Sequence, residues 1–399
     1  MSKILYEKEV EKLENQIKLE KVKDLNLLCN YENGAVVFVD DENMSTVTQF
    51  LSDLDPCHLP NDMFVYLSES GFFTTDEDTF IQSYVHITDR CNMNCAGCYS
   101  RTSARNRVAD MTIDQIRTVF DELQKHGVAR IVISGGEPML RHDIVQVLDY
   151  AKKCGFEILM ITNGSITIPN EVFSRLDVVS FSIDYLDQEY NSVNRKINKE
   201  LLLANIQRAR ACGVPATGII TINSLNIDEV ENYFKLSMEY QLPISFSIFY
   251  SEDSECQHLL IKDDQLRSFI LKCKDGAEHL IEGFTAFDEI YCRNQCSVGH
   301  GSLSVDATGN LNPCHMMHKI VLGNLVSNPE EAWENLQAFN EEVHISAECQ
   351  KCDYKVLCGA GCKARSLMRK GLDTKDPYCE MYRSYYKEQY EYIKELIST

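Results

Sequence analysis

The sequence lacks any apolar run long enough to cross a membrane. None of its 399 residues falls in an uninterrupted stretch of about eighteen apolar side chains, the minimum for a spanning helix. The first residues, Met-Ser-Lys-Ile-Leu-Tyr-Glu-Lys, continue into alternating charge and lack the apolar segment of a secretory signal peptide. We therefore expect a cytoplasmic protein.

Positive charge is also scarce. The chain has 39 Lys and Arg against 60 Asp and Glu, a formal net charge of −21. Nucleic acids and anionic lipid surfaces are polyanions, so a chain of this charge is repelled by both. The composition predicts no nucleic-acid partner and no membrane partner.

Cysteine, in contrast, is abundant, with 17 residues. Disulfides are rare in a reducing compartment, so cysteines clustered at short spacings in such a protein indicate metal binding. Three lie between Cys91 and Cys98, and eight lie between Cys292 and Cys379. The others fit the interpretation of small buried apolar side chains: Cys29, Cys57, Cys154, Cys212, Cys256 and Cys273.

From residue 83 to about residue 250, apolar strand-like runs alternate with helical segments. This pattern predicts an α/β fold with a parallel sheet, either an open sheet or an incomplete β/α barrel. In both, ligands bind at the carboxyl ends of the strands. The expected strands are residues 84–87, 130–134, 157–162, 178–183, 217–222 and 244–249, and the expected helices are 112–125, 143–154, 200–212 and 227–240.

The flanking regions differ from this pattern. Residues 1–80 predict a small winged-helix-like module, with a strand at 34–39, helices at 44–54 and 61–70, and an extended piece from Phe72. Residues 285–381 are rich in loops and cysteine, which predicts a region stabilised by metal. A charged, tyrosine-rich helix is expected at 385–397. The predicted domains are therefore 1–80, 81–284 and 285–399.

The first cysteine cluster follows the first expected strand. Cys91, Cys95 and Cys98 have the spacing C-x3-C-x2-C. Three thiolates on a four-iron cluster leave one iron without a protein ligand, and that iron can bind a small molecule. The alternative is a zinc site that takes a fourth ligand such as His86.

Further motifs follow the next strands, and together they resemble the radical S-adenosylmethionine (SAM) superfamily over about residues 83–250. The resemblance implies a partial (β/α)6 radical SAM barrel, a [4Fe–4S] cluster on the three cysteines, and reductive cleavage of SAM to a 5′-deoxyadenosyl radical. The motifs are Gly135-Gly136-Glu137-Pro138, Thr162-Asn163-Gly164 and Ser182-Ile-Asp184.

The resemblance also implies roles for these residues. The glycine pair and Glu137 would meet the amino group of SAM, which suits close backbone approach and a carboxylate. Ser182 and Asp184 would approach the ribose hydroxyls, and Arg195, or its neighbour Lys196, the methionine carboxylate. Pro138 and Asn163 complete the expected SAM-binding set. The sequence departs from the family at Gly97, where an aromatic residue is common; Tyr99 is the expected substitute against adenine.

The C-terminal cysteines resemble the SPASM domain of radical SAM enzymes at every interval. They read Cys296-x12-Gly309-x4-Cys314, then Cys349-x2-Cys352-x5-Cys358-x3-Cys362, then Cys379, with Cys292 upstream. The resemblance implies two auxiliary [4Fe–4S] clusters, and so three clusters in all. Cys292, Cys296, Cys314 and Cys362 would hold the first; Cys349, Cys352, Cys358 and Cys379 would hold the second. Two zinc-ribbon sites are the alternative.

Residues 33–40 and 67–73, with the two helices between them, resemble the leader-peptide recognition element of ribosomal-peptide (RiPP) maturases. That element binds the leader as an added strand; a structural cap on the barrel is the alternative. Residues 1–80 carry seventeen acidic and six basic side chains, which suits a basic leader or simply aids solubility.

Three functions therefore compete. The first is a radical SAM peptide maturase that modifies a ribosomally made peptide, for example by crosslinking, with a flavodoxin- or ferredoxin-type electron donor. The second is another SPASM maturase, acting on a tetrapyrrole or on a sulfatase; His315, where sulfatase maturases carry an aspartate base, argues against the latter. The third is a non-catalytic electron carrier, against which the intact SAM motifs argue. No catalytic acid or base is identified.

Overall fold

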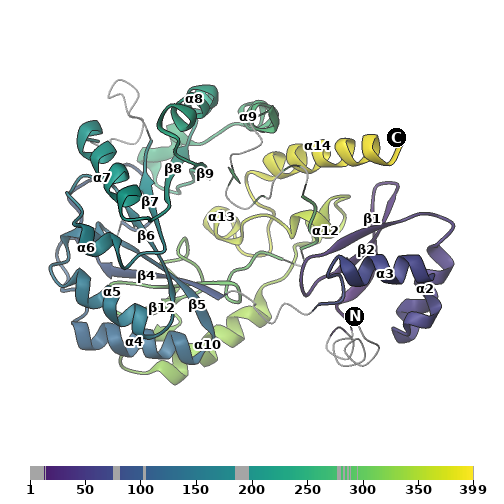
Figure 1. Cartoon of the computed structure of the whole chain (residues 1–399), viewed down its shortest axis with the longest axis horizontal. Coiled ribbons are helices and arrows are strands. Elements are labelled where there is room, and N and C mark those ends of the chain that lie inside the picture. The colour runs from purple at the N-terminus through teal and green to yellow at the C-terminus, as the bar shows by residue number, and fades with distance from the viewer. Residues whose placement is uncertain are drawn as a thin grey trace. The chain divides into compact units, whose positions relative to one another are not determined.

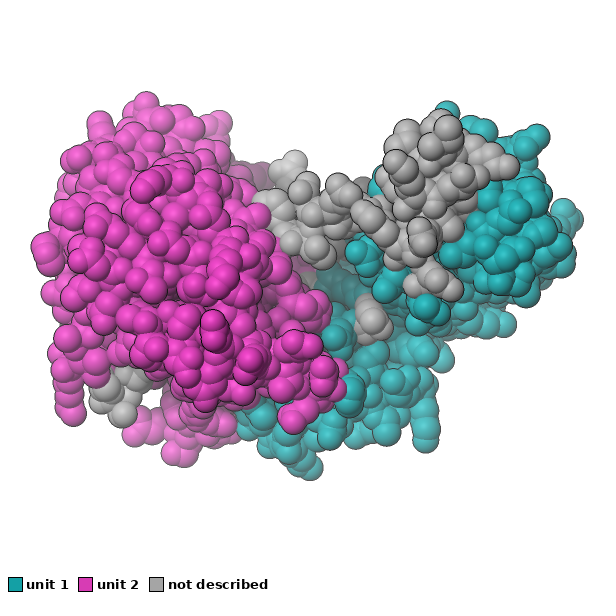
Figure 2. Space-filling view, turned by 90° about the horizontal axis from the view of Figure 1, so that it is seen from below, with its two compact units in different colours: residues 1–79, 287–296, 344–399 teal, residues 80–286, 297–343 magenta. Residues whose placement is uncertain are grey.

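The chain divides into two compact units, each assembled from separate segments (Figure 2). Unit 1 comprises residues 1–79, 287–296 and 344–399, and unit 2 comprises residues 80–286 and 297–343. The domain boundaries at residues 80 and 284 remain predictions. The cysteine-rich region contributes residues to both units. The computed structural model describes residues 13, 15–74, 81–101, 105–184, 197–275, 280–281, 284, 287, 289–293 and 295–398.

Unit 2 is built on a ten-stranded sheet whose order follows the chain from β4 to β10 (Figure 1). Neighbours in this series pair in parallel, as a partial β/α barrel requires. The predicted α/β fold and all six expected strands are confirmed. The strands are β4 (Ile81–Thr88), β5 (Val128–Gly135), β6 (Glu157–Thr162), β7 (Val178–Ser182), β8 (Ala216–Ile222), β9 (Ile244–Ile248) and β10 (Leu280–Ile281).

The four expected helices of this unit are also present. Helix α4 (Ile113–Lys125) shows why: Thr112 and Gln115 cap it reciprocally, and its Ile116, Val119 and Phe120 are fully buried. The 227–240 segment forms a short 3-10 turn (Ile227–Glu229) followed by α8 (Val230–Tyr240). The other two expected helices are α5 (Ile144–Lys153) and α7 (Lys199–Ala211). The unit also contains α6 (Asn170–Phe173) and α9 (Asp263–Asp275).

Part of the cysteine-rich region extends the same sheet. Strand β11 (Ser302–Val305) pairs in parallel with β4, and β12 (Asn310–Asn312) and β13 (Gly323–Asn324) follow antiparallel. Helix α10 (Pro329–Glu342) comes next. Residues 302–342 thus have regular secondary structure, and the expectation that metal stabilises the region stays a prediction. The strands escaped prediction because they are two to four residues long.

The N-terminal part of unit 1 is a three-stranded antiparallel sheet with two helices. Its strands are β1 (Ile17–Val22), β2 (Leu25–Asn30) and β3 (Val36–Val39), in that order, with α2 (Met44–Asp53) and α3 (Asn61–Glu69). The strand and helices expected here are confirmed. The β1–β2 hairpin was not predicted, because lysine and glutamate mask its alternation. Phe72 and Phe73 lie in a turn and are buried, so the extended piece expected there is wrong.

The C-terminal part of unit 1 is helical. Short helices α11 (Ala347–Gln350), α12 (Lys355–Cys358) and α13 (Lys363–Arg369) precede α14 (Cys379–Ser398). The expected tyrosine-rich helix at 385–397 is confirmed and begins earlier, at Cys379. Among the described residues of both units, no helix has the length and apolar character needed to cross a membrane.

Candidate functional site

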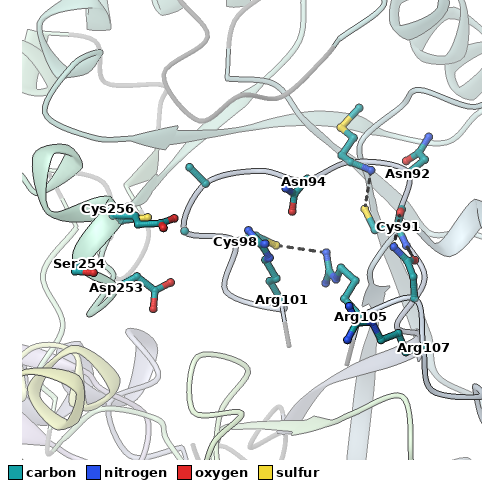
Figure 3. A pocket seen from close by; sticks show the side chains of 15 residues that line it. Cys91, Asn92, Asn94, Cys98, Arg101, Arg105, Arg107, Asp253, Ser254 and Cys256 are labelled. Atoms are coloured by element: carbon teal, nitrogen blue, oxygen red, sulfur yellow. Dashed lines mark hydrogen bonds between the residues drawn. The ribbon is translucent and has the colours of Figure 1, made fainter. Parts of the chain in front are cut away.

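The first cysteine loop leaves the carboxyl end of β4, where the sequence predicted the chemistry. Cys91 and Cys98 line a cavity of about 1100 Å³ (Figure 3). Arg101 and Arg105 lie on the cysteine side of the cavity, and Asp253, Ser254 and Cys256 line it opposite. The cavity combines thiols with guanidinium groups, a donor set suited to a negatively charged thiolate-bound cluster and an anionic ligand group.

A carboxylate and an amide fix the start of this loop. Asp110 accepts hydrogen bonds from the Thr88 hydroxyl at 2.8 Å, the Asp89 N–H at 2.9 Å and Arg90 Nε at 3.1 Å. Asn106 accepts from the backbone N–H of Cys91 at 2.9 Å and donates to its carbonyl at 3.3 Å. The backbone of Cys91 is therefore held on both sides.

Arg105 places a basic group beside the thiol of Cys98. Its Nη1 lies 3.8 Å from Cys98 Sγ, and its Nη2 donates to the carbonyl and hydroxyl oxygens of Ser100 at 2.8 Å each. Burial raises the pKa of the Cys91 thiol, and the positive charge of Arg105 opposes that rise. Since cluster ligands are thiolates, Arg105 favours the form that binds iron. Sequence reasoning missed Arg105, Asn106 and Asp110, which belong to no motif.

The glycine pair of the second motif packs directly on the cysteine loop. The N–H of Gly136 donates to the Thr88 carbonyl at 2.9 Å, and that of Glu137 to the Arg90 carbonyl at 2.8 Å. A β-carbon on Gly136 would lie 2.0 Å from the Arg90 oxygen, and one on Gly135 would lie 2.3 Å from the Thr88 oxygen. Only glycine permits this approach. The predicted contacts of the pair with SAM stay predictions.

Glu137 and Asn163 join the second and third motifs to the same loop. The Glu137 carboxylate is 1% exposed and accepts from the Thr162 hydroxyl at 2.7 Å and the Asn163 N–H at 2.8 Å. The Asn163 side chain donates to Asn92 Oδ1 at 3.0 Å, and Asn92 donates to the Ser165 hydroxyl at 2.8 Å. The structure thus brings together the first three sequence motifs at one edge of the sheet.

For the remaining residues predicted to bind SAM, the structure gives their positions in the fold but no link to the cysteine loop. Ser182 ends β7, and the fully buried Asp184 accepts from the Thr221 N–H at 3.1 Å. Pro138 is buried in a 3-10 turn after Glu137. Arg195 lies outside the described residues. The SAM contacts of all four stay predictions.

The departure at Gly97 has a structural counterpart. Gly97 has φ +60°, and a β-carbon there would lie 2.3 Å from the ring of Phe249. Tyr99, the substitute expected from sequence, instead pairs its hydroxyl with that of Ser134 at 3.2 Å and lies edge-on to His315, with ring centroids 5.3 Å apart. The aromatic ring beside Gly97 therefore belongs to Phe249.

His86, the fourth ligand suggested for the zinc alternative, is buried on β4. Burial lowers the pKa of its imidazole to about 4, which keeps the ring neutral. Among the residues that the structure describes, no three Cys, His, Asp or Glu side chains form a group able to hold a single metal ion.

Four cysteines of unit 1 line one smaller cavity of about 280 Å³. They are the four that the sequence assigned to the second auxiliary cluster: Cys349, Cys352, Cys358 and Cys379. Burial raises the pKa of the Cys358 thiol, and it raises that of Cys379 to about 11. Four thiols around one cavity fit a fully ligated four-iron cluster, in which metal binding displaces the thiol protons.

The four cysteines assigned to the first auxiliary cluster are placed differently. Cys314 belongs to unit 2, whereas Cys292, Cys296 and Cys362 belong to unit 1. Cys292 Sγ donates to the Asn30 carbonyl at 3.3 Å, and the Cys292 N–H donates to the Gly34 carbonyl at 2.8 Å. A hydrogen bond with Cys292 and burial raise the pKa of the Cys29 thiol. Cys292 thus lies against the β2–β3 turn, and its role as a ligand stays a prediction.

Known protein families match both the barrel and part of the cysteine-rich region. Residues 85–237 match the Radical SAM superfamily, and residues 296–353 match SPASM, an iron–sulfur cluster-binding domain. The AdoMet-dependent heme synthase of Methanosarcina barkeri is 25% identical over 337 residues, which cover 73% of this chain and 94% of the relative. The mycofactocin maturase MftC of Mycolicibacterium smegmatis is 24% identical over 324 residues, covering 73% and 81%.

A solved structure matches a larger share of the chain. Streptococcus suis SuiB bound to its precursor peptide SuiA is similar with a TM-score of 0.60 at 14% identity, over 91% of this chain and 98% of that one. The likeness shows the fold. Together with the domain matches, and with the cysteine loop, glycine pair and four-cysteine cavity described above, it establishes that the chain is an enzyme of the radical SAM superfamily with a SPASM iron–sulfur cluster-binding domain.

Proposed function

We propose that this enzyme is a peptide maturase that cleaves SAM reductively and modifies a ribosomally made precursor peptide, for example by crosslinking. When bound, SAM and the cluster on Cys91, Cys95 and Cys98 supply a 5′-deoxyadenosyl radical that abstracts a substrate hydrogen. The chain holds the cysteine loop through Asp110 and Asn106 and maintains thiolate character through Arg105.

The observation that carries the proposal is the share of the chain over which its fold is similar to that of SuiB. Residues 1–80 make up a fifth of the chain, so a match over 91% of it extends into them. SuiB binds a precursor peptide, and the relative MftC is named a maturase. A module shared with a peptide-binding enzyme supports a peptide substrate here.

The architecture of the module suits that role. Its sheet has the order β1-β2-β3, so β1 and β3 are its edges among the described strands. An exposed sheet edge binds an extended peptide through backbone hydrogen bonds. The formal charge of −11 on residues 1–80 favours a leader with basic side chains.

Three [4Fe–4S] clusters form part of the proposal, with domains at 1–80, 81–284 and 285–399. The four-cysteine cavity supports the second auxiliary cluster most directly. A fully ligated cluster near the substrate can accept an electron from the product radical. A flavodoxin- or ferredoxin-type protein would deliver the reducing electron.

A second candidate is tetrapyrrole modification. It is favoured by the heme synthase relative, of which the match covers 94%. The two candidates differ in the size and chemistry of the substrate, so direct product analysis separates them.

Co-expression with any short peptide that a neighbouring gene encodes, followed by mass spectrometry, tests the proposal. A peptide maturase is expected to shift the mass of its peptide, for instance by −2 Da for one crosslink formed with loss of two hydrogens, in a manner that requires Cys91. An unmodified peptide, together with turnover of a porphyrin precursor by the same preparation, would favour the second candidate.

A further inference from the structure

A buried ion pair lies beside the four-cysteine cavity. Arg365, on α13, and Asp376, in the loop before α14, are 7% and 2% exposed. Arg365 Nη2 lies 2.8 Å from Asp376 Oδ2, and Arg365 Nε donates to both carboxylate oxygens at 3.1 Å. Arg365 Nη2 also donates to the Tyr382 hydroxyl at 2.7 Å. The geometry is the forked arrangement in which a guanidinium and a carboxylate are most rigid.

Asp376 contacts the backbone of two cysteine-bearing segments at once. Its Oδ2 accepts from the N–H of Cys362 at 2.7 Å, and its main-chain carbonyl accepts from the N–H of Cys379 at 3.0 Å. Its Oδ1 accepts from the Tyr378 N–H at 2.7 Å. Cys362 and Cys379 belong to different predicted clusters. One carboxylate residue therefore fixes a ligand of each.

The packing around Asp376 leaves little freedom. Gly361 has φ +70°, and a β-carbon there would lie 2.8 Å from Asp376 Cβ. Asp376 and Tyr382 both line the four-cysteine cavity. The Cys358–Cys362 segment is thus pressed against the residue that anchors it.

The pair is also placed to act electrostatically on the thiolates. Arg365 and Asp376 are both buried, and the Asp376 carboxylate accepts a hydrogen bond from the Cys362 N–H at 2.7 Å. The two charges cancel while both are present. Removing one leaves an uncompensated buried charge next to the cysteines. Reduction potentials of iron–sulfur clusters respond to such nearby charge.

We propose that the Arg365–Asp376 pair is a positioning device that fixes Cys362 and Cys379 relative to each other and keeps the charge beside the four-cysteine cavity balanced. The inference rests on the presence of auxiliary clusters in the proposed function. Arg365 and Asp376 act through Cys362 and Cys379 and are not themselves ligands.

The test uses the enzyme in which Cys91, Cys95 and Cys98 are alanine, so that the auxiliary clusters alone are titrated. Asp376→Asn leaves the arginine charge unbalanced and is expected to raise the auxiliary midpoint potentials. Arg365→Met leaves the carboxylate and is expected to lower them, and the double variant is expected to return toward the parent. Asp114→Asn, in an exposed pair with Arg117 on α4, serves as the control and should leave iron content and potentials unchanged.

Iron content and thermal melting are measured on every variant. Loss of auxiliary iron from folded Asp376→Asn supports the positioning role. If Arg365→Met does not fold, Arg365→Lys keeps the charge and loses the fork; it should lower iron content at unchanged potential. Full iron content with unshifted potentials in Asp376→Asn and in either arginine variant would overturn the inference. A parent without auxiliary iron would instead refute the cluster assignment itself.

Discussion

A β-carbon on Gly136 would lie 2.0 Å from the backbone oxygen of Arg90, so the glycine motif and the cysteine loop are packed backbone to backbone. The contact joins the ends of β5 and β4, because the Gly136 N–H also bonds the Thr88 carbonyl. The glycine thus has a role in shaping the cluster loop that precedes any contact with SAM.

Gly136→Ala is therefore expected to disturb the cluster loop itself. A distance under 3 Å to a backbone atom forces the loop to shift, and the iron bound there and SAM cleavage should both fall sharply. Iron analysis and 5′-deoxyadenosine production measure the effect. Gly127→Ala, where φ is +77° but a β-carbon meets no atom within 4 Å, is the control that adds backbone strain without a clash. Normal iron and normal cleavage in Gly136→Ala would show that the loop tolerates the displacement.

Arg105→Met should weaken the same site by removing a charge. The substitution deletes the contacts to Ser100 and Cys98, each a charge-assisted interaction worth about 1.5–3 kcal/mol. We expect SAM cleavage to fall on the order of tenfold or more, since about 1.4 kcal/mol corresponds to a factor of ten. Arg107→Met, on the wall of the same cavity, removes an equal charge as the matched control. Equal effects of the two variants would reduce the role of Arg105 to general cavity charge.

The iron content tests the number of clusters. Anaerobic reconstitution is expected to give about twelve irons per chain, and alanine at Cys91, Cys95 and Cys98 together to leave about eight and abolish SAM cleavage. Iron, sulfide and zinc are measured in the same samples. Zinc as the main metal, or unchanged iron in the triple variant, would contradict the assignment.

Cys292 offers a further test of the auxiliary clusters. It is a predicted ligand of the first auxiliary cluster, and its thiol lies beside the carbonyl of Asn30, the last residue of β2. We expect Cys292→Ala to lose part of the auxiliary iron, as Cys296→Ala should. The thermal midpoint of Cys292→Ala should also fall, since a buried thiol is removed. Full iron content in Cys292→Ala, with loss of iron in Cys296→Ala, would contradict the ligand role of Cys292.

The sequence predicted the barrel well because its strands are apolar and alternate with helices. It also identified the motifs that meet at the cysteine loop, since Gly135, Glu137 and Asn163 lie at or just after strand ends. Short-range patterns contain no sign of the Cys29–Cys292 or Arg365–Asp376 contacts, which depend on how distant segments pack. Strand β11 was not predicted because its four residues, Ser302–Val305, are too few to show a clear alternation, and only their pairing with β4 identifies them as a strand.

Unit 1 combines the N-terminal module with the cysteine-rich helices, so deletion of the module is a poor test of its role. Residues 1–79 share a compact unit with 344–399, and Asp24 bonds Tyr390 and Lys394 on α14. Deleting the module would remove packing partners of the cysteine-rich helices. A shortened peptide probes leader recognition without disturbing the enzyme.

The most direct measurement is product formed per SAM cleaved, with intact enzyme and either the full precursor peptide or the same peptide without its leader. The account predicts that SAM cleavage proceeds with both peptides, while modification falls strongly without the leader, because the module raises the local concentration of the peptide. Leader supplied as a separate peptide should not restore it. Equal modification of both peptides would contradict leader recognition, and modification of neither would contradict the peptide-maturase assignment.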